Sequence, residues 1–200
     1  MNFGIHPMLG LGDLRFGMTP EETNNIATPF GPSKQLSHAP LAFSSEEIAE
    51  YRSLLGEEGL AALLDATEDQ NAINNRLRDV FYPQVTMRLT YDAGRLSAIQ
   101  VSRLMRELHF QGLRFFHSDT RAFLAALERA NGAPALVLGP DCAFHNVHIY
   151  VWAAFEIFDG GAYRIYSEDD EDAQDKSLIL SSQARDPIED FSRHTAISFQ

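Results

Sequence analysis

Cysteine is almost absent from this 200-residue sequence, and its single copy, Cys142, excludes a disulfide within the chain. Long apolar runs are missing as well, since no stretch approaches the roughly 20 apolar residues that a membrane-spanning helix needs. Residues 1–7 contain no basic cluster and lead into no apolar segment, so no signal peptide is indicated, and no lipidation motif is present. From these absences we expect a cytoplasmic protein that does not bind membranes. With 44% hydrophobic residues, it can form a core without covalent cross-links.

Basic residues are also scarce. Lys and Arg total 16 against 28 Asp and Glu, which gives a formal net charge of −12. Residues 141–200 contain 12 acids and 4 bases, and so carry −8 of this charge. Nucleic-acid binding requires a basic face that neutralises phosphates, and this composition argues against it. An acidic surface instead favours solubility and attracts basic partners.

The short motifs of catalysis are missing too. The sequence has no Gly-rich phosphate-binding loop, no Gly-x-Ser-x-Gly nucleophile elbow and no His-Glu-x-x-His metal motif. Glu21 and Glu22 are adjacent carboxylates, but helix capping and the helix dipole account for both. We therefore predict no catalytic residue, no metal ligand and no cofactor.

Capping signals mark the helices of the first half of the chain. Thr19 stands three residues before Glu22, a capping box that predicts a helix ending near Thr28. Ser44 begins the same arrangement, and apolar residues then recur at helical spacing. We interpret residues 44–82 as a helical insertion, separated from the first helix by a loop.

Alternating apolar residues predict the strands. Residues 85–91 alternate, Asp92-Ala93-Gly94 follows as a turn, and residues 96–101 return as a second strand, a pattern typical of a β-hairpin. In the second half, Ser118 is a candidate N-cap for a helix that ends at Asn131-Gly132. Further strands are predicted after this helix, at residues 147–158, 163–166 and 177–180, with a short edge strand around Ile197 and Phe199.

A faint internal similarity organises these elements. Leu14-Arg15-Phe16 recurs 99 residues later as Leu113-Arg114-Phe115, and each triplet precedes a hydroxyl residue and a helical pattern. We predict an α+β fold made of two degenerate repeats, each with helices packed on antiparallel β-sheet. The first repeat covers residues 1–106 and contains the insertion, and the second covers residues 107–200 with an acidic loop and a C-terminal tail.

The segment from Gly10 to Glu22 resembles a broad set of bacterial proteins. They open a repeat with a short strand, a Gly-Met-Thr/Ser-x-Glu-Glu turn and a helix, here Gly17-Met18-Thr19-Pro20-Glu21-Glu22. The group includes the β-lactamase-inhibitor-protein-like fold and the small lipoprotein of the outer-membrane assembly machinery. The resemblance implies helices on one face of an antiparallel sheet and a role in binding proteins. It assigns no functional residues, because Gly17 forms a turn and Thr19 a cap. The second half lacks the motif proper, and no lipidated cysteine is present.

The densest acidic segment is the candidate partner-binding site. A solvated loop is one interpretation of it, and a docking surface for a basic partner is the functional one. The spacing and central Gly of an EF-hand are missing, so calcium is not predicted. The acids of the segment are Glu168, Asp169, Asp170, Glu171, Asp172 and Asp175.

A second cluster contains residue types that bind metals. Asp141, Cys142, His145 and His148 lie close together in sequence, and zinc needs three or four such groups to converge. If the segment is a strand, positions three apart point to opposite faces, so convergence requires a loop. Cys142 lacks a helix start or Gly-rich setting that would lower its pKa, which favours a small buried hydrophobe over a nucleophile.

These observations favour a non-enzymatic protein-binding module. The specific hypothesis is a bacterial inhibitor or immunity-type protein that neutralises a cognate basic toxin, without a cofactor, nucleic acid or membrane. Two alternatives stay open: a metal-dependent enzyme centred on Asp141, His145 and His148, and a structural or sensor subunit. The oligomeric state does not follow from the sequence.

Overall fold

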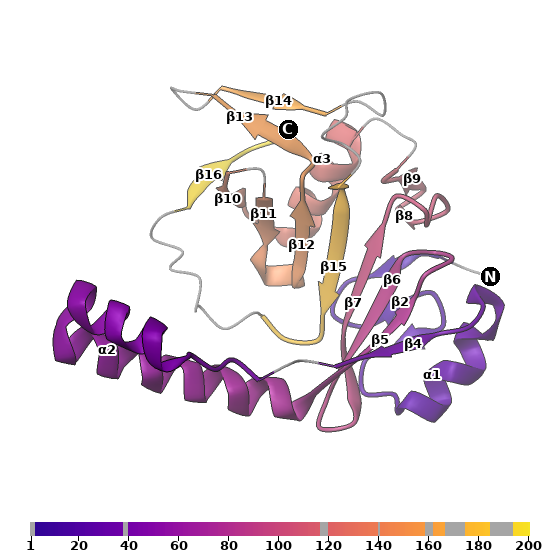
Figure 1. The fold of residues 1–200 in the computed structure, drawn as a ribbon. Helices are drawn as coiled ribbons and strands as arrows, with labels where there is room; N and C mark the ends of the chain where they lie inside the picture. The colour runs from indigo at the N-terminus through magenta and orange to yellow at the C-terminus, as the bar shows by residue number, and fades with distance from the viewer. Residues whose placement is uncertain are drawn as a thin grey trace.

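The computed structural model describes residues 3–37, 40–116, 120–139, 141–158, 162–166, 175–184 and 194–200. Within these ranges the protein has an α+β fold in which helices pack on antiparallel β-sheet (Figure 1). The predicted fold class is therefore confirmed.

The first half opens with a small sheet and a capped helix. The sheet has three two-residue strands, β1 (Ile5–His6), β2 (Gly10–Leu11) and β3 (Leu14–Arg15). Helix α1 (Pro20–Ala27) follows and continues into a 3₁₀ turn, η1 (Thr28–Phe30). The capping box is formed as predicted, because the Thr19 N–H donates to the Glu22 carboxylate at 2.7 Å and the Glu22 N–H donates to the Thr19 hydroxyl. The pKa of Glu22 is lowered because its carboxylate accepts hydrogen bonds from the Thr19 backbone N–H and from the Thr19 hydroxyl.

A nine-stranded antiparallel sheet spans both halves. The first half provides β4 (Lys34–Leu36), β5 (Leu77–Tyr82), β6 (Met87–Asp92) and β7 (Arg95–Ser102). The second half provides β10 (Ala135–Leu138), β11 (Asp141–Phe144), β12 (Ile149–Trp152), β15 (Ser177–Ser181) and β16 (Thr195–Ile197). Their order is β16-β10-β11-β12-β15-β7-β6-β5-β4, so β15 and β7 join the halves at the centre.

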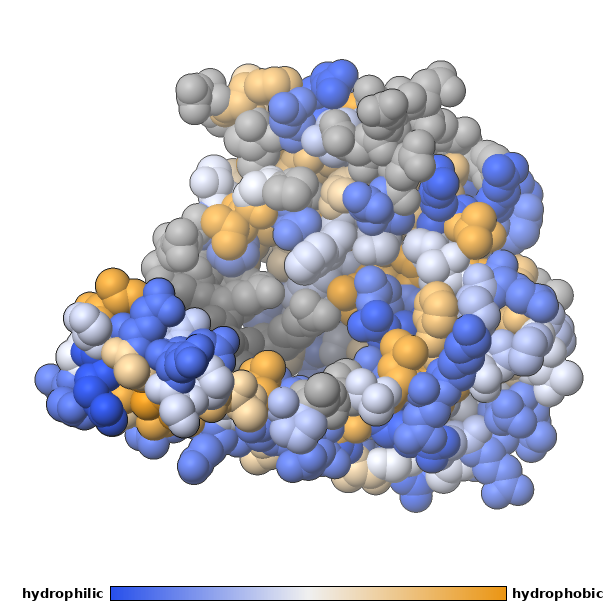
Figure 2. All heavy atoms as spheres, in the orientation of Figure 1, coloured by the Kyte–Doolittle hydropathy of each residue, from blue (hydrophilic) through white to orange (hydrophobic). Residues whose placement is uncertain are grey.

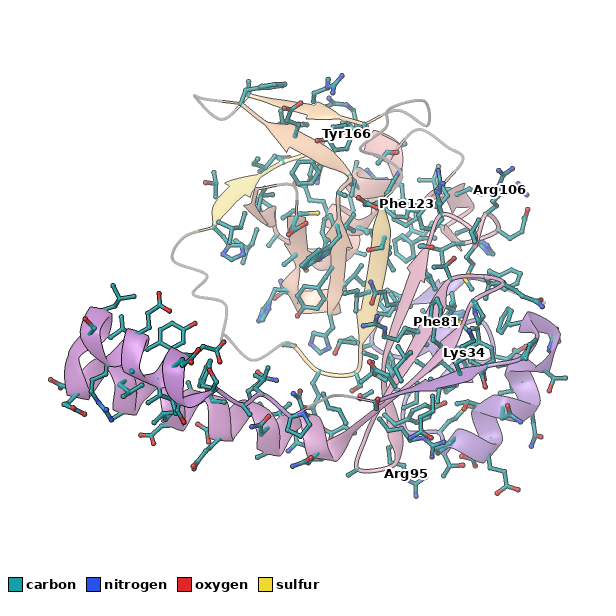
Figure 3. All side chains as sticks on the ribbon, in the orientation of Figure 1. Lys34, Phe81, Arg95, Arg106, Phe123 and Tyr166 are labelled. Carbon is teal, nitrogen blue, oxygen red and sulfur yellow. The ribbon has the colours of Figure 1, made fainter. Side chains whose placement is uncertain are left out.

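One face of this sheet forms the main core. A row of cross-strand neighbours crosses seven strands on this face, and every member is buried: Tyr82, Met87, Val101, Leu178, Val151, Cys142 and Val137. Helix α1 covers the first half of this face, where the hydroxyls of Thr23 and Tyr91 share a buried hydrogen bond. Helix α3 (Thr120–Asn131) covers the second half through Phe123, which lies 4.7 Å from Phe115 between ring centroids (Figure 3).

Two short hairpins complete the described strands. β8 (His109–Phe110) pairs with β9 (Leu113–Arg114), and β13 (Phe155–Ile157) pairs with β14 (Tyr163–Ile165). Neither hairpin belongs to the nine-stranded sheet.

A long helical arm, α2 (Ser45–Arg76), stands off from the sheet (Figure 1). Its capping box at Ser44 is formed as predicted, and the helix is kinked at Gly56, whose φ of 73° and ψ of 178° are not helical. A glycine is required there because L side chains rarely adopt this backbone conformation. The arm joins the sheet where it runs directly into β5.

Three sequence predictions need correction. The helical insertion predicted to reach residue 82 ends at Arg76, and residues 77–82 form β5, which is held by pairing with both β4 and β6. The expected loop before the insertion contains β4. The single strand predicted over 147–158 is divided, because His148 and Ala153 take positive φ and bracket β12.

Candidate protein interface

The predicted acidic site lies mostly outside the described residues. Glu168, Asp169, Asp170, Glu171 and Asp172 fall in the part of the chain that the structure does not describe. Asp175 is described and exposed, two residues before β15 begins at Ser177. Ser177 is the cross-strand partner of Trp152 on β12. Of the predicted acids, Asp175 therefore stands close in sequence to the strand position that pairs with the single tryptophan.

The candidate metal ligands do not converge. Asp141 is the first residue of β11, whereas His145 follows the last residue of that strand in a 3₁₀ turn, η2 (His145–Val147). Four residue-to-residue steps along an extended strand place their Cα atoms about 13 Å apart. Among the residues that the structure describes, no group of three His, Cys, Asp or Glu side chains could hold a metal ion. Asp141, His145 and His148 thus do not form the metal centre considered as an alternative.

Cys142 belongs to the core. Its side chain is buried on the helix-covered face, and burial raises the pKa of the thiol, with a further rise from the nearby Asp141 carboxylate. A thiol with a raised pKa stays protonated at neutral pH, and the thiolate is the reactive form. This environment suits a packing role and opposes nucleophilic catalysis.

The face of the sheet opposite the main core changes character from one half to the other. A continuous row of cross-strand neighbours crosses it, in the order Lys34, Phe81, Arg88, Gln100, Ile179, Tyr150, Ala143 and Leu136. The first half of this row is largely polar and begins with Lys34 beside Phe81 (Figure 3). The second half is apolar. There Ala143, Tyr150 and Ile179 form a second buried cluster, flanked by half-buried Leu136.

A small hollow lies at the edge of this second cluster. Its volume is about 130 Å³, and residues of β10, β11 and β12 line it together with His194. Two large apolar side chains at the hollow are exposed, Trp152 at 44% and Leu138 at 42%. Small-molecule pockets typically measure about 300–1,000 Å³, so this hollow is too small for most ligands of that kind. Its volume is close to that of one small apolar group.

This surface was only partly accessible to sequence reasoning. Trp152 stands out as the single tryptophan on a strand with apolar residues on both faces, a pattern that suits either a core or an interface. Leu138 and the hollow were missed, because they depend on β10 and on its pairing with β11. Gly139 with a positive φ of 60° is the local turn signal that could have indicated that hairpin.

No protein-family model, curated protein or solved structure matches the chain. None of the helices in the described ranges has both the length and the apolar character that crossing a bilayer requires. The family resemblance of residues 10–22 stays a prediction.

Proposed function

We propose that the protein is a non-enzymatic binding module for another protein, and specifically a cytoplasmic immunity-type inhibitor that neutralises a cognate basic toxin. The observation that carries this proposal is the apolar rim of the hollow, formed by Trp152 and Leu138 on the sheet face opposite the main core. Tryptophan is enriched among the residues that dominate binding energy at protein interfaces, especially next to a pocket.

Electrostatics support a basic partner. Asp175, the described acid of the segment, is exposed and stands two residues before Ser177, the cross-strand partner of Trp152. We assign partner contacts to Glu168, Asp169, Asp170, Glu171, Asp172 and Asp175. Charged residues around an apolar centre increase the association rate and select partners of opposite charge.

The order of elements supports the interpretation of two degenerate repeats. Each half has short paired strands, then a helix, then antiparallel strands whose last long member, β7 or β15, lies at the centre of the sheet. A repeated scaffold of this kind presents one extended sheet face, which suits binding to a macromolecule.

Affinity capture tests the proposal with three forms of the full chain. Wild-type protein, Trp152→Ala and Leu9→Ala are immobilised and exposed to extract of the native host at 50 and 300 mM salt. Leu9 is a matched control because it is 61% exposed and lies in the turn between β1 and β2. We expect one basic protein to be retained by wild type and Leu9→Ala, and lost from Trp152→Ala.

Two further measurements address the inhibitor role. Charge reversal at Asp169, Asp170 and Asp172 is expected to weaken capture more at 50 mM than at 300 mM salt, because salt screens exposed charges. Expression of the captured protein is expected to arrest growth, and co-expression of this chain to restore it. The proposal fails if wild type retains no specific protein, or if Trp152→Ala retains the same protein equally well.

A further inference from the structure

The kinked arm α2 exposes large apolar side chains far from the sheet. Leu54 is 70% exposed and Leu55 51%, and both immediately precede the kink at Gly56, while Leu64 beyond it is 36% exposed. We refer to these three residues as the arm leucines. Figure 2 shows hydrophobic residues on the arm set among strongly hydrophilic ones. Of the residues in this helix, only Leu60 is buried.

The arm is also strongly acidic. Residues 45–76 contain eight acids and two bases, a net charge of −6 and half of the charge of the whole chain. Both bases are already paired, because Arg52 contacts Glu57 at 2.9 Å and Arg76 contacts Asp92 at 2.7 Å. Six exposed carboxylates have no ion pair within the described part of the chain, namely Glu46, Glu50, Glu58, Asp65, Glu68 and Asp69.

Local contacts fix the shape in which the arm presents these groups. The Arg52–Glu57 ion pair spans the kink. A side chain at Gly59 would come within 2.8 Å of the Leu55 Cβ atom, so the chain packs closely on itself just after the kink. Asn71 makes two hydrogen bonds to the backbone of Leu41, at 2.7 and 2.8 Å, which fasten the preceding loop along the helix. Such pre-ordering lowers the entropy lost on binding.

We infer that the arm is a second docking element, in which the arm leucines enter an apolar groove on a basic protein and the surrounding carboxylates pair with its Lys and Arg side chains. This inference rests on the proposed protein-binding function and adds a contact separate from Trp152. The occupant follows from charge complementarity. A second copy of this chain would bring two arms of −6 together, and like charges in contact oppose association. A helix whose apolar anchors enter a groove of its partner is a common recognition mode.

Three synthetic 18-residue helical peptides probe the arm directly, independently of the host partner. One combines Leu with Lys, the second Leu with Glu, and the third Ser with Lys. Binding to the full-length protein is followed by fluorescence anisotropy at 50 and 300 mM salt. We expect the Leu/Lys peptide to bind at least about tenfold more tightly than the other two, because only that peptide matches both the leucines and the carboxylates.

Paired variants assign the binding to the arm. Leu54→Ala combined with Leu64→Ala is expected to weaken Leu/Lys binding at least about tenfold, since buried apolar anchors dominate affinity. The matched control is Leu9→Ala with Leu104→Ala, which removes side chains that are 61% and 53% exposed elsewhere. That control is expected to bind within about twofold of wild type, as residues outside an interface contribute little.

A second pair of variants tests the charges. Asp65→Asn with Glu68→Gln is expected to weaken binding about threefold at 50 mM salt and less at 300 mM, because salt screens exposed charges. Asp13→Asn with Glu21→Gln removes two exposed carboxylates outside the arm and is expected to have no such effect. Circular dichroism of every variant verifies that the fold is retained.

The outcomes separate the arm from the proposed function. Equal binding of the Ser/Lys and Leu/Lys peptides, or unchanged binding after the leucine substitutions, overturns the arm as a docking element. A dimer in sedimentation velocity that Leu54→Ala with Leu64→Ala dissociates also overturns it, because the occupant is then a second copy. If this double variant still captures the host protein and Trp152→Ala does not, the arm inference fails while protein binding stands. If wild type captures nothing, the proposed function fails, and the peptide-binding measurements still test whether the arm is a docking element.

Discussion

Glu128 on α3 holds the last residues of the sequence against the core. Its side chain is buried, with 4% exposure, and both carboxylate oxygens accept hydrogen bonds. Ser198 Oγ donates to one oxygen at 2.8 Å, and the Phe199 backbone N–H donates to the other at 2.7 Å. Phe199 is 2% exposed and packs 5.7 Å from Phe155 between ring centroids. We predict that Glu128→Ala destabilises the protein by releasing this segment.

The magnitude follows from the two hydrogen bonds. A hydrogen bond to a charged group contributes about 1.5–3 kcal/mol, so the pair contributes roughly 3–6 kcal/mol. Substitution also removes the cost of burying the carboxylate, which places the expected loss in the free energy of unfolding near the lower limit, about 3 kcal/mol. For a chain of this length, that loss corresponds to a Tm decrease of about 6–12 °C. Glu128→Gln keeps one oxygen acceptor, and we expect about half the loss.

Urea unfolding followed by circular dichroism and by the fluorescence of the single tryptophan measures the effect. Glu107→Ala is the control, because Glu107 forms an exposed ion pair with Arg114 at 3.1 Å and such pairs contribute little. A double-mutant cycle with Phe199→Ala tests the coupling, since the second substitution costs less once the segment is released. The reasoning is refuted if Glu128→Ala unfolds within about 0.5 kcal/mol of wild type, the range typical of neutral surface substitutions.

Three more predictions concern the core and the arm. Burial raises the pKa of Cys142 above its ordinary value of 9.0, so only the unfolded chain releases the thiol proton as the pH passes that value, and stability falls. Above that pH, the free energy of unfolding should fall by about 1.4 kcal/mol per pH unit. Urea unfolding measured from pH 8 to 10 should show this fall in the wild type and not in Cys142→Ala, and equal slopes in the two proteins contradict the assignment. Thr23→Val leaves the buried Tyr91 hydroxyl without its partner and should cost about 1–3 kcal/mol, measured by thermal unfolding, with Thr28→Val as an exposed control. Gly56→Ala forces an L side chain into a φ of 73° and should cost about 1–3 kcal/mol in the arm, seen as faster amide exchange in α2 with the sheet unchanged; unchanged exchange in α2 argues against strain at the kink.

Features that depend on neighbouring residues were predictable from the sequence. The capping boxes at Thr19 and Ser44 set the starts of α1 and α2, because each requires only four consecutive residues. The hairpin of β6 and β7 was equally accessible, since its turn and its alternation are both local. The end of α3 followed from Asn131-Gly132.

Features that depend on distant pairing were not predictable. Leu77, Val80 and Phe81 fit a helical spacing, and only pairing with β4 and β6 makes their segment a strand. The residues predicted as one strand over 147–158 leave the sheet at Ala153, whose positive φ no apolar pattern reveals. The hollow beside Trp152 needs three paired strands before it exists.

The acidic charge indicates a binding partner only where exposed apolar side chains lie near the carboxylates. A net charge of −12 spread over a polar surface serves solubility and identifies no partner. Here uncompensated carboxylates accompany exposed leucines on α2, and Asp175 stands two residues before Ser177, the cross-strand partner of exposed Trp152 on β12. A partner held by charge alone would bind weakly and dissociate as salt rises, whereas apolar anchors provide affinity that salt does not screen. The combination therefore favours a protein whose surface is both basic and apolar over a free cation, a nucleic acid or bulk solvent.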